Sequence, residues 1–331
     1  MTSPQPVTDL MWAHWKTKTM LSAVEVGVFT ELAKEPLPGP VLRDRLGLHP
    51  RPATDFFDAL VALGLLVRSD DRYANAPEAA EYLDRHRPAS YLGGSFLTQC
   101  AGLADDLTEV LRTGRAARQA RDGRDFYRAM YAASDSVRAF QKDMTALSMG
   151  PARAIAEKFP WERYRSLADI GCAEGALPGH VLARHPHLTA VGFDLPPARA
   201  GFAEYTERLG VADRVTFQEG DFFHDPLPSA DVLVFGHVLH NWGQEEKLRL
   251  LRAAHRALPD DGAVLVYETL IDDERRSNAI GLILSLIMHA EVPGGFDYTG
   301  AECRAWLREA GFSQTYVEHL EGPESMVVGI K

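Results

Sequence analysis

Leu167-Ala-Asp-Ile-Gly-Cys-Ala-Glu-Gly175 is the stretch that decides the fold of this 331-residue chain. A short apolar run ends in Asp-x-Gly, and the last glycine of the stretch leads into a helix-like segment. Further strand-like runs follow, with helix-like segments between them. We expect strands at 167–171, 189–194, 214–219, 231–236, 263–269 and 325–330. This alternation predicts an α/β fold with a mostly parallel, doubly wound sheet that helices cover on both faces.

The composition of the chain is typical of a soluble enzyme. Apolar residues make up 46% and charged residues 24% of the sequence, which places it among ordinary globular proteins. The net charge of −11 argues against a nucleic-acid partner, because phosphate binding requires clustered lysine and arginine. The apolar runs are too short for a membrane span, and the N-terminus carries no secretory signal pattern. Three widely separated cysteines fit a reducing compartment, so we expect a cytoplasmic enzyme.

The part of the chain before the strand-rich region divides into two segments. Residues 37–76 follow the pattern of a winged helix-turn-helix, with two short helices, a glycine turn and a hairpin. The second of these helices contains Asp55 and Asp58 and no basic residue, so it would repel a phosphate backbone. We therefore interpret this unit as a dimerisation domain and not as a DNA-binding one. The expected organisation is a winged-helix dimerisation domain at 1–87, a helical linker that contributes to a substrate pocket at 88–164, and a cofactor-binding domain at 165–331.

Polar residues and glycines at the ends of the first three expected strands indicate a cofactor site. Asp194 lies 19 residues after Gly175, where a carboxylate can bind both hydroxyls of a ribose. Gly220-Asp-Phe222 follows the third strand, where an acid can accept from an exocyclic amine and an aromatic ring can stack on adenine. The pattern departs from the nicotinamide fingerprint, because Ala173 replaces the second glycine. The expected cofactor-binding residues are Asp169, Gly171, Gly175, Asp194, Leu195, Gly220, Asp221, Phe222 and His237.

With these motifs the chain resembles the plant caffeic-acid and acetylserotonin O-methyltransferases and their bacterial relatives in antibiotic biosynthesis. The resemblance covers nearly the whole length, and the family's D-x-G-x-G-x-G corresponds to Asp169-x-Gly171-x-Ala173-x-Gly175. It implies a Rossmann-like class I methyltransferase domain, S-adenosylmethionine as the cofactor and a small-molecule acceptor. It also implies a homodimer formed through the winged-helix domain.

His240-Asn-Trp242 supplies the candidate catalytic base. This imidazole lies just past the carboxyl end of an expected buried strand, where open α/β sheets carry out their chemistry, and it titrates near neutrality. The family's usual His-Asp-Trp is altered here, because Asn241 replaces the acid. The resemblance further implies two acids that flank the base, Glu268 and Asp297, the second one methylene shorter than the family's glutamate. A carboxylate bonded to the far imidazole nitrogen fixes the tautomer and raises the basicity.

The acceptor pocket is expected to combine two segments. Phe140 and Met144 lie near one helical stripe, which fits either a core-facing surface or a pocket wall. In the relatives, the segment that contains Met288, His289 and Glu291 lines the acceptor pocket. We expect all five residues to belong to the substrate pocket.

We expect an S-adenosylmethionine-dependent O-methyltransferase that acts on a hydroxyl of a small aromatic or enolic acceptor, with His240 as general base and no metal. One alternative is a metal site made of His240, His289 and a carboxylate such as Glu268 or Glu291. A branch that resembles this family uses such a metal to methylate the carbon of an α-keto acid. The remaining alternatives are a non-methylating relative and a winged-helix ligand sensor, and the intact cofactor motifs count against the sensor.

Overall fold

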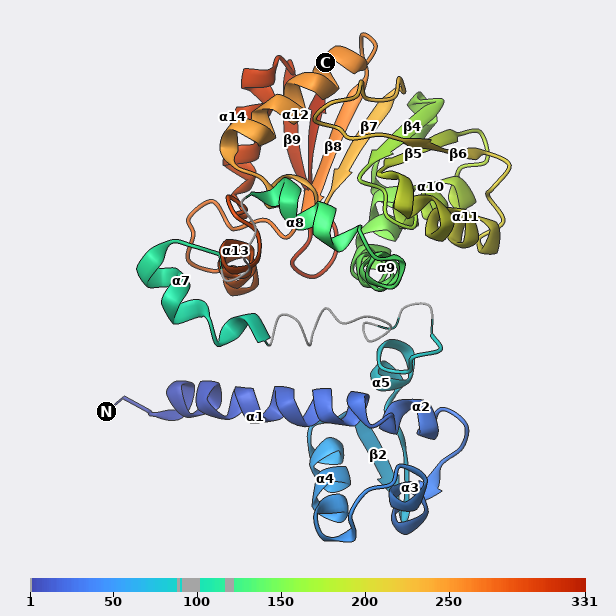
Figure 1. Cartoon of the computed structure of the whole chain (residues 1–331), viewed down its shortest axis with the longest axis vertical. Helices are drawn as coiled ribbons and strands as arrows, with labels where there is room; N and C mark the ends of the chain where they lie inside the picture. Colours follow the sequence, from blue (N-terminus) through green and yellow to red (C-terminus); the bar gives the residue numbers. More distant parts are fainter. Residues whose placement is uncertain (1, 88–89, 91–101, 117–121) are drawn as a thin grey trace. The chain divides into compact units, whose positions relative to one another are not determined.

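A computed structural model describes residues 2–87, 90, 102–116 and 122–331. The chain divides into two compact units, Met1–Thr98 and Gln99–Lys331, which are described separately (Figure 1). Each unit has a hydrophobic core of its own, one in the first unit and one on each face of the sheet in the second. Among the described residues, no helix combines the length and the apolar character that crossing a membrane requires.

The first unit consists of helices and a small antiparallel sheet of order β1-β3-β2. Its elements are α1 (Gln5–Glu25), α2 (Val28–Leu32), β1 (Leu37–Pro38), α3 (Gly39–Arg45), α4 (Pro50–Ala62), β2 (Leu66–Ser69), β3 (Arg72–Asn75) and α5 (Pro77–Tyr82). The acid Asp58 on α4 accepts a hydrogen bond from Tyr73 Oη at 2.7 Å and pairs with Arg68 Nη1 at 2.9 Å. Both partners lie on the hairpin, so this acid ties α4 to β2 and β3.

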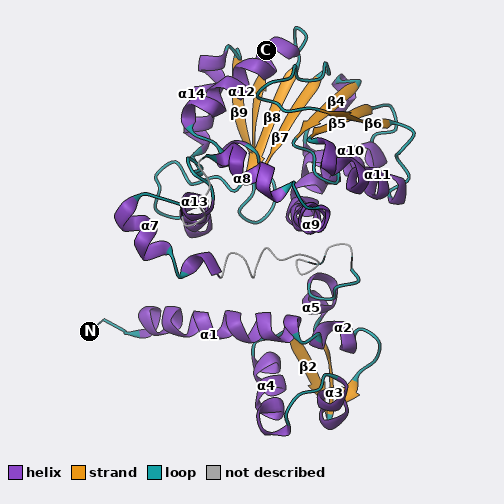
Figure 2. Cartoon of the chain, viewed as in Figure 1, coloured by secondary structure: helices purple, strands orange, loops and turns teal. Residues whose placement is uncertain are grey.

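The second unit is built on a seven-stranded sheet of order β6-β5-β4-β7-β8-β10-β9 (Figure 2). Its strands are β4 (Ser166–Ile170), β5 (Thr189–Asp194), β6 (Val215–Glu219), β7 (Val232–Gly236), β8 (Ala263–Glu268), β9 (Gln314–His319) and β10 (Ser325–Ile330). The first five strands in chain order are parallel, and β10 runs antiparallel to both neighbours. All six predicted strands are confirmed to within one residue. The prediction missed β9, a largely exposed edge strand whose polar sequence lacks an apolar core pattern.

Helices cover both faces of this sheet and so confirm the doubly wound α/β fold. The core of one face contains side chains from α9 (Ser134–Lys158), α10 (Ala176–Arg184) and α11 (Arg199–Arg208). The opposite core contains side chains from α12 (Gln244–Ala257) and α14 (Gly300–Ala310). The other α-helices that the structure describes in this unit are α7 (Leu107–Thr113), α8 (Gly123–Met130) and α13 (Ala279–Glu291).

The order of the strands reverses between β4 and β7, because β5 and β6 lie on one side of β4 and β8 lies beyond β7. In open α/β sheets, ligands bind outside the carboxyl ends of the strands at such a reversal. The candidate residues of β4, β5 and β7 all lie at that edge.

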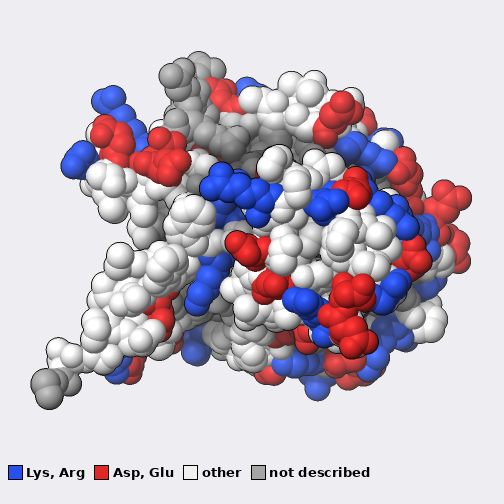
Figure 3. All heavy atoms as spheres, turned by 90° about the horizontal axis from the view of Figure 1, so that it is seen from below, with Lys and Arg blue, Asp and Glu red and all other residues white. Residues whose placement is uncertain are grey.

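Charged and apolar side chains are unevenly distributed over the surface. On the face seen in Figure 3, acidic and basic side chains are interspersed over most of the molecule. By contrast, α1 carries large apolar side chains that are well exposed, Trp12 at 59% and Trp15 at 66%. Its outer end is a mostly white projection in that view.

Candidate functional site

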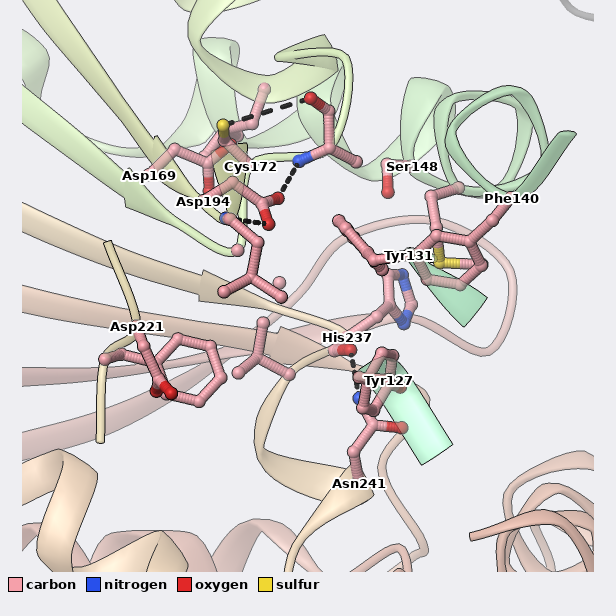
Figure 4. Close-up of a pocket in the computed structure, with 18 of the residues that line it drawn as sticks. Tyr127, Tyr131, Phe140, Ser148, Asp169, Cys172, Asp194, Asp221, His237 and Asn241 are labelled. Atoms are coloured by element: carbon pink, nitrogen blue, oxygen red, sulfur yellow. Dashed lines mark hydrogen bonds between the residues drawn. The ribbon is translucent and has the colours of Figure 1, made fainter. Parts of the chain in front are cut away.

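A pocket with about 1050 Å³ of empty space opens at the carboxyl ends of β4, β5 and β7 in the second unit (Figure 4). Most of the expected cofactor-binding residues line it: Asp169, Gly171, Asp194, Leu195, Gly220, Asp221, Phe222 and His237. Gly175 does not line the pocket and instead precedes α10 as its N-cap. Three strand ends that are far apart along the chain therefore meet at one cavity, as their order along the sequence predicted.

The glycines after β4 are required by the protein's own packing. Gly171 and Gly175 have φ of 77° and 81°, a region in which side chains with a Cβ are disfavoured. A Cβ on Gly171 would lie 2.8 Å from Val238 Cγ2, and one on Gly175 would lie 2.6 Å from Phe202 Cε2. At both positions a neighbouring side chain therefore occupies the space that a Cβ would need.

Asp194 is held at the pocket by the backbone. Its Oδ2 accepts from Ala173 N at 2.9 Å and its Oδ1 accepts from Leu195 N at 2.7 Å. Burial raises the pKa of Asp194 to about 6, although these two hydrogen bonds favour the charged form. Burial, together with the charge of Asp194, raises the pKa of Asp169 to about 8. At neutral pH the pair therefore carries its negative charge on Asp194, which has lone pairs available for a ribose.

The segment after β6 has internal hydrogen bonds of its own. Asp221 Oδ1 accepts from Phe223 N at 2.9 Å, and its Oδ2 lies 2.8 Å from His224 Nδ1. The rings of Phe222 and Phe223 pack edge-on against Trp242, with centroids 5.8 and 4.7 Å away. These aromatic rings give one end of the pocket an apolar wall.

The candidate base and its two acids come together in a cluster that does not itself line this pocket, although the neighbouring residues Asn241 and Tyr267 do. His240 Nδ1 lies 3.1 Å from Asp297 Oδ1, and the backbone N–H of His240 donates to Glu268 Oε1 at 3.1 Å. All three residues are buried. Asp297 is fixed further, because its backbone N–H donates to Ser285 Oγ on α13. The structure thus assembles a histidine–carboxylate pair from segments 57 residues apart.

The charges of this cluster depend on one another. Burial lowers the pKa of His240, but the carboxylates Glu268 and Asp297 outweigh it and raise that pKa to about 9. Burial in turn raises the pKa of Glu268. The two carboxylates therefore favour the protonated imidazole, and His240 accepts a proton only in its neutral form.

Ligand atoms of His240, Glu268 and Asp297 lie within 4.8 Å of one another, close enough to hold a metal ion. Across the described part of the chain this is the single group with that property, and His289 does not belong to it. His289 instead stacks on Phe296, with ring centroids 6.5 Å apart. The two-histidine arrangement considered from the sequence is therefore not assembled here.

The expected substrate-pocket residues separate into two groups. Phe140 and Met144 on α9 line the pocket. Met288, His289 and Glu291 on α13 do not line it, and Met288 is buried. The charge of Glu291 nonetheless helps to raise the pKa of Tyr127, which indicates that α13 lies near this wall.

Sequence reasoning missed the wall contributed by α8. Arg124, Tyr127 and Tyr131 line the pocket from this segment, and Figure 4 shows both tyrosines near His237 and Asn241. The helix packs tightly, because a Cβ on Gly123 would lie 2.9 Å from Trp242 Cζ3. Two tyrosines four residues apart were the available signal, but a core-facing stripe gives the same pattern.

The chain is similar to known proteins over most of its length. A family model described as an O-methyltransferase domain matches residues 105–313. The chain is 42% identical to the tetracenomycin polyketide synthesis 8-O-methyl transferase TcmO of Streptomyces glaucescens, over 99% of this chain and 97% of TcmO.

Two further relatives are similar over almost their whole length. The N,N-dimethyltransferase OxyT of Streptomyces rimosus is 35% identical, with 98% of this chain and 95% of OxyT covered. The 3-hydroxy-5-methyl-1-naphthoate 3-O-methyltransferase of Streptomyces sahachiroi is 33% identical, with 99% and 95% covered. Among solved structures, human N-acetylserotonin methyltransferase in complex with S-adenosylmethionine has a TM-score of 0.86 at 24% identity, with 99% and 97% covered. At that identity, the similarity establishes a shared fold.

Proposed function

The chain belongs to the S-adenosylmethionine-dependent O-methyltransferase family, and from that premise we propose that its acceptor is a hydroxyl of a small aromatic or enolic molecule, with His240 as the general base. The observation that carries the proposal is the 3.1 Å contact between His240 Nδ1 and Asp297 Oδ1 beside the cofactor pocket. With Nδ1 bonded to a carboxylate, Nε2 is the nitrogen left to accept a proton.

The nature of the acceptor is supported by the pocket wall and by the relatives. Tyr127, Tyr131, Phe140 and Trp242 give the pocket an aromatic lining, which suits a flat acceptor. By its name, one relative methylates a hydroxyl of a naphthoate and another acts in the synthesis of a polyketide.

The residues present fit the cofactor. Asp194 would hold the ribose hydroxyls, and Phe222 would pack against the adenine. When bound, S-adenosylmethionine supplies a methyl group that is open to in-line displacement. The pocket aligns the acceptor oxygen with that methyl group, and His240 Nε2 removes the hydroxyl proton.

The proposal is tested with methyl-labelled cofactor and a panel of phenols, enols, amines and α-keto acids, with and without a chelator. We expect transfer to phenols or enols that a chelator does not affect. His240→Gln should lower kcat by about 10²–10⁴-fold with little change in the affinity for S-adenosylhomocysteine. The exposed His319→Gln on β9 is the matched control.

Other outcomes of this experiment point to other chemistry. Transfer only to amines would match the activity named for OxyT and would refute the hydroxyl acceptor. Carbon methylation that a chelator abolishes, with His289→Ala as damaging as His240→Ala, would identify the metal-assisted alternative.

We further propose that the protein is a cytoplasmic homodimer formed through α1 and that it does not bind nucleic acid. The exposed Trp12 and Trp15 on α1 present more apolar surface than a small unit ordinarily leaves in water. The net charge of −11 opposes binding to phosphate backbones. Light scattering should show a dimer at micromolar concentration and a monomer for the Trp12→Glu/Trp15→Glu double variant. A wild-type monomer under these conditions would refute the dimer.

A further inference from the structure

A buried lysine lies between the two loops that carry the candidate base and its acid. Lys247 belongs to the first turn of α12 and is 0% exposed. Its Nζ donates to the carbonyl oxygen of Trp242 at 2.7 Å and to that of Phe296 at 2.9 Å. Trp242 follows His240 by two residues, and Phe296 directly precedes Asp297. A single side chain therefore bridges the backbones of both catalytic loops.

The surroundings of Nζ use all of its donors. Besides the two carbonyls, Nζ lies 3.2 Å from the centroid of the Phe296 ring. Two carbonyl oxygens and one ring face match the three N–H groups of an ammonium. Burial lowers the pKa of Lys247 to about 7, while the charges of Glu268 and Asp297 oppose that change.

Stability alone does not explain a buried charge at Lys247. Desolvation of an ammonium is costly, and an apolar side chain of similar size often fills such a site without loss of stability. A lysine here instead defines where two carbonyls lie relative to each other. A backbone hydrogen bond, from Phe296 N to His240 O at 2.8 Å, joins the same loops on their own, and Lys247 adds two further bonds to this connection.

We propose that Lys247 is a positioning residue for methyl transfer, which holds the loop of His240 against the loop of Asp297 and so maintains the contact between Nδ1 and Oδ1. This inference rests on the proposed role of His240 as the base. Lys247 Nζ bonds the backbones of the loops that carry His240 and Asp297, so it acts through the position of His240.

The test compares Lys247→Met with Lys158→Met in the full-length protein. Lys158 is a matched control, because its Nζ also donates to two backbone carbonyls, those of His319 at 2.5 Å and Leu320 at 3.0 Å, but at the end of β9. Lys247→Met should lower kcat by about 10–100-fold, since small displacements of a catalytic group have effects of this size. KM for the cofactor should not change. Lys158→Met should keep the wild-type kcat.

A double variant separates positioning from stability. In a His240→Ala background, Lys247→Met should cause no further loss of kcat, because the residue through which it acts is gone. A wild-type kcat in Lys247→Met would overturn the proposal. So would a loss of kcat from Lys247→Met that is as large in the His240→Ala background as in the wild type, or an equal loss in Lys158→Met.

A spectroscopic readout is independent of turnover. In protein with ¹⁵N-labelled histidine, Lys247→Met should shift the ring signals of His240, whereas Lys158→Met should leave them in place. If wild-type protein transfers no methyl group but Lys247→Met shifts these signals, the proposed function fails while the positioning role stands. If Lys247→Met does not fold, Phe296→Leu, which removes the ring face from Nζ, should shift the same signals in folded protein. Unshifted signals in the folded variants refute the role.

Discussion

The cofactor pocket and the buried cluster beside it, here called the cofactor end and the catalytic end, hold their carboxylates in different ways. At the cofactor end, Asp194 is bonded by two backbone N–H groups, so its charge depends on main-chain geometry. At the catalytic end, Asp297 is bonded to the side chain of His240 in a buried cluster that also contains Glu268. The charges of Glu268 and Asp297 raise the pKa of His240, and the charges of His240 and Asp297 act in opposite directions on the pKa of Glu268. Substitutions should therefore remain local at the first end and spread through the cluster at the second.

The largest effect is expected at the catalytic end. Asp297→Asn keeps the shape of the side chain but removes the charge that supports the imidazolium and its tautomer, so kcat should fall by about 10²–10⁴-fold. The affinity for S-adenosylhomocysteine, measured by calorimetry, should stay unchanged. A wild-type kcat in this variant would mean that Glu268 orients the base. The dependence of the catalytic end on a side-chain charge would then have to be assigned to Glu268.

At the cofactor end, Asp194→Ala should weaken cofactor binding by more than about 100-fold, because two hydrogen bonds from the ribose hydroxyls to a charged group contribute about 1.5–3 kcal/mol each. Asp231→Ala is the matched control, since Asp231 Oδ2 also accepts two backbone N–H bonds, from Arg165 at 2.7 Å and Ser166 at 3.1 Å, before β7 and away from the pocket. Calorimetry with S-adenosylhomocysteine compares the two. Equal losses in both variants would show that Asp194 supports the loops and does not bind ribose.

The pH dependence should separate the two ends within the wild-type protein. His240 has a pKa of about 9 and accepts a proton only in its neutral form. kcat/KM should therefore rise about tenfold from pH 7 to pH 8 and level off above pH 9. Cofactor affinity should fall below pH 6, as Asp194, with a pKa of about 6, becomes protonated. Asp297→Asn should move the inflection of kcat/KM to lower pH, because a charge that raises the pKa of His240 is gone.

The cofactor end is also the part that could be predicted from residue spacing. Its carboxylate and glycines follow consecutive strands, and parallel strands bring their carboxyl ends to one edge. The acids of the catalytic end lie 28 and 57 residues from His240, and spacing alone does not bring them together; only family resemblance indicated them.

The wall from α8 had only an ambiguous sequence signal, and the bridge made by Lys247 had none. A lysine at a helix start is ordinarily solvated, and two tyrosines on one helical face ordinarily face a core. What could not be predicted is which side chains tertiary packing turns toward the pocket.

The smallest effect is expected at Ala173, where the family motif has glycine. Ala173 has a φ of 49°, and left-handed backbone costs an L-residue about 1–2 kcal/mol. Ala173→Gly relieves that strain but gives up about 0.4–1 kcal/mol through the freer unfolded chain. The free energy of unfolding, from urea titration, should therefore rise by about 0–1.6 kcal/mol. Cofactor affinity should not change, because the Ala173 N–H that bonds Asp194 remains. A loss of affinity as large as that of Asp194→Ala would show that the Ala173 methyl group contacts the ligand, and the cofactor end would then depend on a side chain as the catalytic end does.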